Sequence, residues 1–341
     1  MPSSTPDGSI DPSGPVPQVT VVVPAYNAVA WLPETLASIA GQTIPPEWLE
    51  VIVVDDQSSD GSAGLAREIL GRSALRHQVL TVTNGGPSRA RNIGWKLATA
   101  PWIQFLDADD LLVPHKIARQ FEAATNQTEP PAVIYSPWTR LTGTGGDWKA
   151  DDFIERPAIG DDPIMDLLHV RNFIAVGSYL MSRRWLERVA GFDESLSLIE
   201  DVHLLLRVAM AGGRYLEASS PEPLFFYRCR RGESLSSQSP ITFSRAQARN
   251  LQLVQEFWEQ NSMLTPARRR LLLEQYQGPL HIFAEAGGQP FDELYRRVLA
   301  LDPHWLPSGP PPLRLLSRLV GYRRAEWASV AYRRLRGRRH R

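Results

Sequence analysis

The sequence predicts an α/β fold built on a mostly parallel β-sheet. Four short runs of apolar, mostly β-branched residues follow one another early in the chain, and the segments between them have the apolar spacing of helices of about 10–15 residues. Strands that are apolar on both faces and alternate with helices are typical of parallel sheets. Polar clusters follow three of these runs, where such sheets bind ligands. The runs are 19–23, 51–54, 79–82 and 102–106, and the clusters are Tyr26-Asn27, Asp55-Asp56 and Asp107-Asp109.

Local signals place the intervening helices. Apolar residues at helical spacing predict a helix over 31–39, which Gly41 ends. A second helix reaches about Leu70, and a third follows the Gly85-Gly86-Pro87 turn and runs through Lys96.

The pattern loosens beyond Arg119. We expect strands at 132–135, 173–181 and 224–227, a helix at 200–211, a loop at 143–152, and helices throughout 242–301. The predicted organisation is a disordered tail (1–17), an α/β domain (18–236), a helical extension (237–305) and a basic tail (306–341).

Composition narrows the class of protein. The 341 residues are 43% hydrophobic and 22% charged, as in an ordinary soluble globular protein. A single cysteine, Cys229, excludes an internal disulfide or a cysteine-based metal cluster. The start of the chain lacks a signal-peptide pattern, and no apolar run reaches the roughly 18 residues of a membrane span. We therefore expect a cytoplasmic protein.

Three carboxylates stand within four residues at Asp107-Ala108-Asp109-Asp110. Carboxylates this close raise one another's pKa unless a cation or hydrogen-bond donors lie between them. A hard cation such as Mg²⁺ or Mn²⁺ would resolve the conflict. A polar turn that caps the following helix is the alternative, and the motif alone does not decide between them.

Five motifs in order resemble the GT-A glycosyltransferases of family 2. They cover roughly residues 19–236, and the ordered set is far more specific than any one motif. The motifs are Val21-Val22-Val23-Pro24-Ala25-Tyr26-Asn27, the run from Val53 to Ser62 around Asp55-Asp56, the Gly-Gly-Pro-Ser-Arg-Ala-Arg-Asn-Ile-Gly run at 85–94, the DxD motif Asp107-Ala108-Asp109, and Gly191-Phe192-Asp193-Glu194 with Glu200-Asp201. The resemblance implies a Rossmann-like sheet flanked by helices, here with a helical C-terminal extension.

The resemblance implies a site for a nucleotide-diphosphate sugar. Tyr26 would stack on the base beside Pro24 and Asn27, and Asp56 would accept a hydrogen bond from the base. Arg89 or Arg91 would face the diphosphate, with a slight preference for Arg91. Asp107 would meet the ribose, and Asp109 would bind the metal. The alternatives are a core tyrosine, an Asx turn and solvated arginines.

Asp201 is the candidate general base, and Glu200 orients the acceptor or the base. Asp201 opens a helix, whose dipole favours the ionised carboxylate that a base requires; a helix cap is the alternative. Many relatives carry a histidine where this chain has Arg230, in Tyr227-Arg228-Cys229-Arg230. A third protein ligand for the metal is therefore in doubt, and Arg230 would lend its charge to the diphosphate instead.

The expected activity is inverting transfer of a sugar, from a UDP-sugar in the first instance, to a hydroxyl of a glycan or lipid-linked acceptor in surface polysaccharide synthesis. A catalytically silent scaffold that binds sugar nucleotides and a nucleotidyltransferase are the alternatives. Intact Asp109 and Asp201 argue against the first. The lack of a basic, glycine-rich triphosphate loop after the first strand argues against the second.

The formal net charge of zero hides an uneven distribution of charge. Residues 313–341 contain ten arginines and one acid, Glu326, so the rest of the chain has 27 basic and 36 acidic residues. Apolar residues lie near one helical face of this tail, which is typical of a helix at an anionic membrane surface. A solvated tail and an acidic partner remain open. The few aromatic residues make nucleic acid an unexpected partner.

Overall fold

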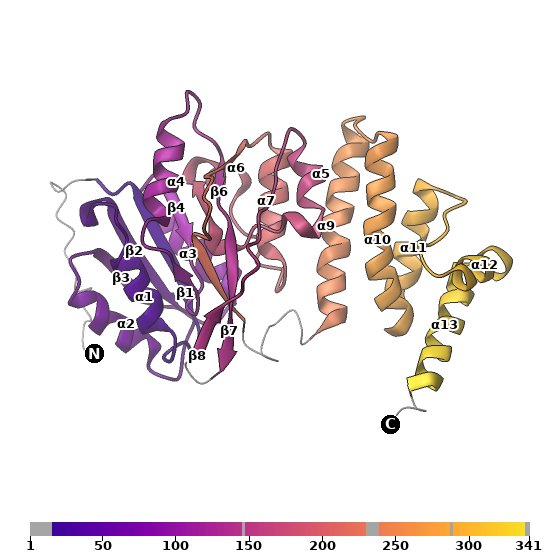
Figure 1. Cartoon of the computed structure of the whole chain (residues 1–341), viewed down its shortest axis with the longest axis horizontal. Helices are drawn as coiled ribbons and strands as arrows, with labels where there is room; N and C mark the ends of the chain where they lie inside the picture. The colour runs from indigo at the N-terminus through magenta and orange to yellow at the C-terminus, as the bar shows by residue number, and fades with distance from the viewer. Residues whose placement is uncertain (1–15, 145–146, 230–238, 287–288, 338–341) are drawn as a thin grey trace. The chain divides into compact units, whose positions relative to one another are not determined.

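A computed structural model describes residues 16–144, 147–229, 239–286 and 289–337 (Figure 1). Contacts divide the chain into two compact units, 1–231 and 232–341. The boundary lies close to the predicted end of the α/β domain at 236. The division of the second part at 305 stays a prediction.

The first unit is built on a seven-stranded sheet with the strand order β10-β6-β9-β4-β1-β2-β3. Strand β9 is antiparallel to both of its neighbours, and every other pairing in this sheet is parallel. The predicted mostly parallel sheet is therefore confirmed. In chain order the strands are β1 Val19–Ala25, β2 Leu49–Asp55, β3 Arg76–Thr81, β4 Trp102–Phe105, β6 Val133–Tyr135, β9 Tyr179–Ser182 and β10 Tyr215–Glu217.

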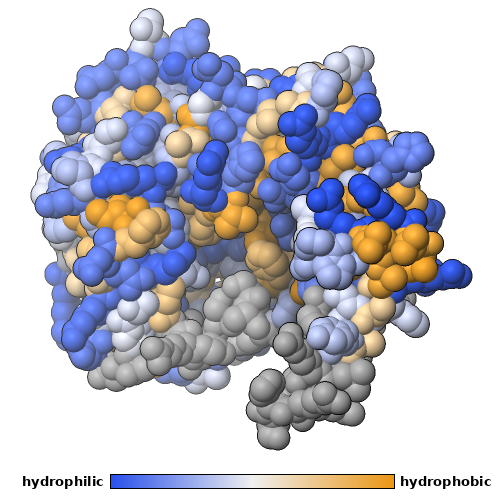
Figure 2. Space-filling model, turned by 45° about the vertical axis from the view of Figure 1, so that its right-hand side comes forward, coloured by the Kyte–Doolittle hydropathy of each residue, from blue (hydrophilic) through white to orange (hydrophobic). Residues whose placement is uncertain are grey.

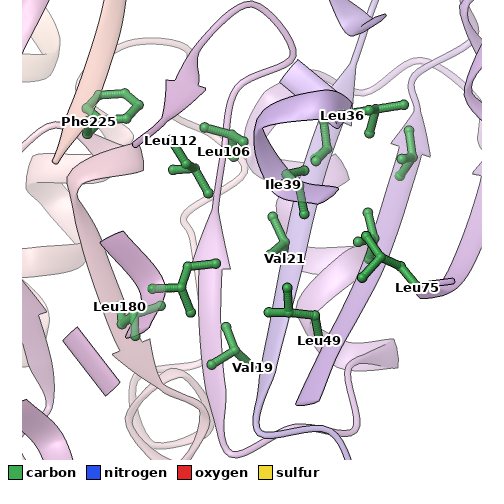
Figure 3. Packing of buried hydrophobic residues seen from close by; sticks show 14 of the residues in the cluster. Val19, Val21, Leu36, Ile39, Leu49, Leu75, Leu106, Leu112, Leu180 and Phe225 are labelled. Atoms are coloured by element: carbon green, nitrogen blue, oxygen red, sulfur yellow. The ribbon is translucent and has the colours of Figure 1, made fainter. Parts of the chain in front are cut away.

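Strand β1 lies inside the sheet between β4 and β2 and is buried on both faces, as its unbroken apolar run predicts. Val21 joins the cluster under helix α1 with Leu36 and Ile39 (Figure 3). Val22 points the other way, toward α3, where a Cβ added to Gly94 would lie 2.3 Å from it. Glycine at 94 therefore lets α3 approach the sheet closely.

The helices and short 3₁₀ turns of this unit fill the connections between strands. The helices are α1 Leu32–Ala40, α2 Ser62–Gly71, α3 Pro87–Leu97, α4 Lys116–Thr125, α5 Pro163–Leu167, α6 Arg183–Val189 and α7 Glu200–Met210. The turns are Pro46–Trp48, Val170–Asn172 and Val176–Ser178.

A second sheet has the strand order β5-β11-β7-β8. Two sequence predictions in and beside it are wrong. The expected loop at 143–152 contains a hairpin, because β7 is held by parallel pairing with the distant β11. The expected strand at 173–181 begins only at Tyr179, because Gly177 lies in a 3₁₀ turn packed against Phe225. The strands are β5 Leu111–Leu112, β7 Trp138–Thr144, β8 Asp147–Ala150 and β11 Phe225–Cys229.

The second unit is helical, as predicted. Its helices are α9 Pro240–Gln260, α10 Pro266–Ala286, α11 Gln289–Leu301, α12 Pro311–Val320 and α13 Tyr322–Gly337. Its core includes Val254, Trp258, Leu272, Tyr276 and Leu280, which are all fully buried. Among the described residues, no helix combines the length and the apolar character needed to cross a membrane.

Candidate active site

The loops after β1 and β2 are joined at the carboxyl edge of the main sheet. Asn27 donates its backbone N–H to Ser58 Oγ at 2.9 Å, and its side-chain oxygen accepts from the backbone of Ser59 at 2.9 Å. Tyr26 is 59% exposed, so the core-tyrosine alternative is wrong and its ring is accessible. Pro24 is half-buried within β1. The nucleotide contacts expected of these residues stay predictions.

Asp56 is buried and shapes the turn before α3. Its two carboxylate oxygens accept the backbone N–H groups of Gly85 and Gly86, each at 2.8 Å. Each oxygen retains further acceptor capacity, so a hydrogen bond to a base is compatible with these bonds. The sequence placed Asp56 at a binding edge but did not show that it also fixes the glycine turn.

Arg91 joins two acidic motifs that are far apart in sequence. Its Nη2 lies 2.6 Å from Asp107 Oδ1, and its Nη1 lies 2.7 Å from Glu200 Oε1. The Arg91 side chain is only 4% exposed. Burial opposes its charge, but Asp107 and Glu200 outweigh burial and raise the pKa of Arg91. We call these three side chains the Arg91 junction.

The junction changes the expectation for the two arginines of α3. Both terminal nitrogens of Arg91 are engaged by carboxylates, so the slight preference for Arg91 at the diphosphate loses its support. Arg89 is half-buried, lies against Gly85 and makes a long 3.4 Å bond to the carbonyl of Thr83. Arg89 is therefore the better candidate for the diphosphate.

Asp201 lies at the start of α7, directly after the junction residue Glu200. Burial and the neighbouring Glu200 carboxylate together raise the pKa of Asp201 to about 7, although a hydrogen bond from the Val202 N–H and the charge of Arg91 act in the opposite direction. From the sequence we expected the helix dipole to keep this carboxylate ionised. Burial and Glu200 outweigh the dipole, so Asp201 is only partly ionised near neutral pH. A carboxylate that titrates near neutral pH suits proton transfer.

The backbone before α7 is strained. Ile199 has a φ of 50° in the left-handed region, which is unfavourable for a β-branched residue. Strain of this kind costs about 1–3 kcal/mol and persists where the surrounding structure requires it. Here the turn directs Glu200 toward Arg91.

Asn92 connects α3 to the motif at 191–194. Its Oδ1 accepts from the Phe192 N–H at 2.9 Å, and its Nδ2 donates to Glu194 Oε1 at 2.8 Å. This contact explains why two motifs about one hundred residues apart belong to one site. His203 is packed rather than free to act as a second base, because it is 5% exposed with its Nε2 3.7 Å from Asp193 Oδ2.

We predict that Gly191→Ala destabilises the protein more than Gly212→Ala. Both glycines have φ in the left-handed region, at 67° and 85°. An added Cβ at Gly191 would lie 2.4 Å from Asn92 Oδ1, whereas at Gly212 nothing lies within 4 Å. The control Gly212→Ala should therefore lose only the backbone cost, roughly 1–2 kcal/mol of unfolding free energy. Urea unfolding should show a larger loss of unfolding free energy for Gly191→Ala. Equal losses would contradict the packing argument.

Asp110, directly after the DxD motif, is a buried acid. Asp110 Oδ1 accepts the backbone N–H of Arg228 at 2.7 Å, and its Oδ2 has no hydrogen-bond partner among the residues that the structure describes. Burial, Asp109 and Asp107 together raise the pKa of Asp110 well above its usual range. Asp107 and Asp109 are half-buried. Asp110 thus supports β11 from the acidic loop.

These carboxylates are compatible with Mg²⁺ or Mn²⁺. Among the described residues, no group of three or more His, Cys, Asp or Glu side chains is arranged to hold a metal. Mg²⁺ usually takes only one or two carboxylates, with water and phosphate oxygens for the remaining positions. Arg230, expected near the diphosphate, lies outside the described residues.

Sequence reasoning missed the surroundings of Arg228. Its fully buried guanidinium contacts the rings of both Trp31 and Trp148, 4.9 and 5.0 Å from their centroids, and lies 2.5 Å from Glu34 Oε2. Arg228 was visible in the Tyr227-Arg228 pair of the motif. Its contact with Trp148 could not be predicted, because Trp148 lies on a hairpin that the sequence predicted to be a loop. Arg228 therefore fastens that hairpin to α1 and the acidic loop.

Comparison with known proteins agrees with this architecture. The structure of Staphylococcus aureus TarS residues 1–349 resembles it with a TM-score of 0.61 and 20% identity, over 93% of this chain and 91% of that one. A mannosyltransferase from Pyrobaculum calidifontis, solved with GDP-Man and Mn²⁺, gives 0.54 and 21% over 96% and 91%. At these identities the likeness concerns the fold, and that fold is the GT-A fold.

Sequence comparison gives the family. Residues 20–189 match the model of glycosyl transferase family 2, and the chain belongs to this family. Succinoglycan biosynthesis protein ExoO of Rhizobium meliloti is 30% identical over 225 residues, which are 64% of this chain and 62% of ExoO. The TarS sequence, a poly(ribitol-phosphate) β-N-acetylglucosaminyltransferase, is 26% identical over 64% of this chain. The chain spans less than half the length of several such relatives, 37% for TarS.

Proposed function

We propose that this chain is an inverting glycosyltransferase that moves a sugar from a nucleoside-diphosphate donor to an acceptor hydroxyl. The observation that carries the proposal is the Arg91 junction, which holds the DxD residue Asp107 and the helix-start residue Glu200 on one guanidinium. Donor and acceptor chemistry need to meet at one place, and this contact joins their two motifs.

The donor side uses accessible and charged groups. The exposed ring of Tyr26 offers a stacking surface for a base, with Pro24 and Asn27 beside it, and Asp56 retains acceptor capacity for a base N–H. Asp107 serves the ribose, and Arg89 with Arg230 would supply positive charge to the diphosphate. Arg91 acts through the two carboxylates that it holds. Asp109 would hold Mg²⁺ or Mn²⁺, which neutralises charge on a leaving diphosphate.

The acceptor side uses Asp201. In its ionised form this carboxylate removes the proton from the acceptor hydroxyl while that oxygen attacks the anomeric carbon opposite the diphosphate. The bond to the diphosphate oxygen breaks as the new glycosidic bond forms, so one displacement inverts the configuration. Glu200 is held by Arg91 and therefore fixes the start of α7.

The known relatives support a choice of substrate class. One TarS structure is a complex with UDP-GlcNAc, and the mannosyltransferase is a complex with GDP-Man and Mn²⁺. Relatives are named for teichoic acid and succinoglycan synthesis. We propose a UDP-sugar donor and a glycan or lipid-linked acceptor in surface polysaccharide synthesis. The proposed location is the cytoplasm, with residues 313–341 at the inner face of the membrane.

Calorimetric titration with UDP, GDP and dTDP tests the donor site. We expect one nucleotide to bind with Mn²⁺ and to bind at least tenfold more weakly with EDTA or in Asp109→Ala, because carboxylate oxygens are favoured ligands of this cation. Glu68→Ala is the matched control, since its side chain is 57% exposed in a surface pair with Arg72.

Two outcomes would contradict this proposal in different ways. Binding that ignores the metal would move the diphosphate onto the arginines and remove the metal role of Asp109. No binding of any nucleotide would favour the catalytically silent scaffold.

A further inference from the structure

The last two helices are fixed to the second unit through one side only. Tyr322 at the start of α13 packs edge-on against Trp305, with ring centroids 5.1 Å apart, and stacks on Phe291. Glu326 Oε1 lies 2.8 Å from His281 Nδ1 on α10. With the buried Ala325, these contacts define an inner face of α13.

Away from these contacts, the same helices expose large apolar side chains. On α12, Leu315 and Leu319 stand one turn apart and are 59% and 73% exposed. On α13, Trp327 and Tyr332 are 63% and 60% exposed. Figure 2 shows a hydrophobic patch on the right of the view, bordered by hydrophilic side chains. We call these four residues the outer face.

The exposed charged side chains that α12 and the start of α13 contribute are arginines. Arg314 and Arg318 are exposed on α12 beside the two leucines, and Arg324 is exposed at the start of α13. Arg323 is exposed as well, but it pairs with Asp292 of α11 at 3.1 Å. The one acid in 313–341, Glu326, is 1% exposed and belongs to the inner face. The sequence gives a net positive tail, and the structure adds that its acid is turned away from the outer face.

We propose that the outer face of α12 and α13 lies on an anionic lipid bilayer, with Leu315, Leu319 and Trp327 in the interfacial layer and the arginines on lipid phosphates. Leucine and tryptophan among arginines, without an exposed acid, is the composition of interfacial helices. Tryptophan and tyrosine favour the headgroup level. Nucleic acid would use the arginines but leave both leucines in water.

This inference rests on the proposed function in one respect: binding to a membrane would bring a glycosyltransferase to lipid-linked acceptors. Its test does not depend on transfer activity. Lipid binding and nucleotide binding are measured separately, so each proposal can fail without the other.

The experiment is co-sedimentation of the full chain with vesicles of phosphatidylcholine alone and of an equal mixture with phosphatidylglycerol. We expect binding to the mixed vesicles and at least tenfold less to the neutral ones. Leu315→Ser/Leu319→Ser and Arg314→Glu/Arg318→Glu should each weaken binding to mixed vesicles at least tenfold. Val170→Ser, at an 81% exposed apolar side chain of the first unit, is the control and should bind as the unchanged chain does.

Three results would overturn the proposal. The first is equal sedimentation with both kinds of vesicle. The second is loss of binding in the arginine variant alone, which would indicate charge attraction without insertion. The third is a dimer in vesicle-free solution that Leu315→Ser/Leu319→Ser dissociates, which would assign the outer face to a second copy of the chain.

Discussion

Asp201→Asn should lower turnover by about 10²–10⁴-fold, the usual contribution of a general base, and leave nucleotide binding unchanged. Asparagine keeps the size of the side chain and cannot accept the hydroxyl proton. Activity of the unchanged protein should rise with pH and level off above about 7, because burial and Glu200 raise the pKa of Asp201 to about that value. Initial rates across pH, with nucleotide titrations, measure both effects.

The same substitution should not destabilise the protein. Asp201 has a folded-state pKa above its ordinary 3.8, so its ionisation opposes folding, and stability falls as pH rises from about 4 through about 7. Asparagine carries no charge and removes that loss. At pH 8 the variant should therefore unfold at the same or a higher temperature than the unchanged chain.

A matched control separates the catalytic role of Asp201 from the effect of removing any one carboxylate. Asp152 is exposed in the same unit, and Asp152→Asn should leave rate and unfolding temperature unchanged. Near-normal turnover in Asp201→Asn would remove Asp201 as the base. A variant with low activity and a lower unfolding temperature at pH 8 would point to a structural role instead.

Arg91→Met should cost about 3–5 kcal/mol of unfolding free energy, the cost of removing one partner from a buried ion pair. Without the guanidinium, Asp107 and Glu200 lose the charge that holds them 2.6 and 2.7 Å from its nitrogens. Transfer should fall with stability, because both acidic motifs lose their common contact. Urea unfolding and initial rates measure the two effects.

A conservative and a compensating variant make this prediction specific. Arg91→Lys keeps the charge but has one terminal nitrogen for two carboxylates, so we expect an intermediate loss. Adding Glu200→Gln to Arg91→Met should recover part of the stability, because one unpaired carboxylate is removed, but should not recover activity. A loss below about 0.5 kcal/mol in Arg91→Met, the range of ordinary surface substitutions, would contradict a buried junction.

The fold of the first hundred residues could be predicted because its signals are local. Unbroken apolar runs gave β1, β2 and β4 to within a few residues. The hairpin β7–β8 could not be predicted in this way, since its pairing partner β11 lies far along the chain. The glycines and aspartates of that segment resemble a loop until the partner strand is known.

The candidate site was predictable as a set of residues but not as a set of contacts. The ordered motifs brought Asp107, Arg91 and Glu200 into consideration, and the structure joins all three. No sequence pattern assigned the nitrogens of Arg91 to two carboxylates, and none anticipated the raised pKa of Asp201. Both depend on burial, which is decided by the packing of α3 against the sheet and of α7 against α5 and α6.

The Arg91 junction also bears on how this protein can change over generations. Its three residues come from distant parts of the chain, yet one guanidinium pairs with both carboxylates. Selection is therefore expected to act on the three positions together. Replacement of Arg91 leaves two carboxylates without their cation, and a lineage that loses Arg91 is expected to replace one or both of the acids soon after. Substitutions at 91, 107 and 200 should therefore occur together among descendants of this sequence.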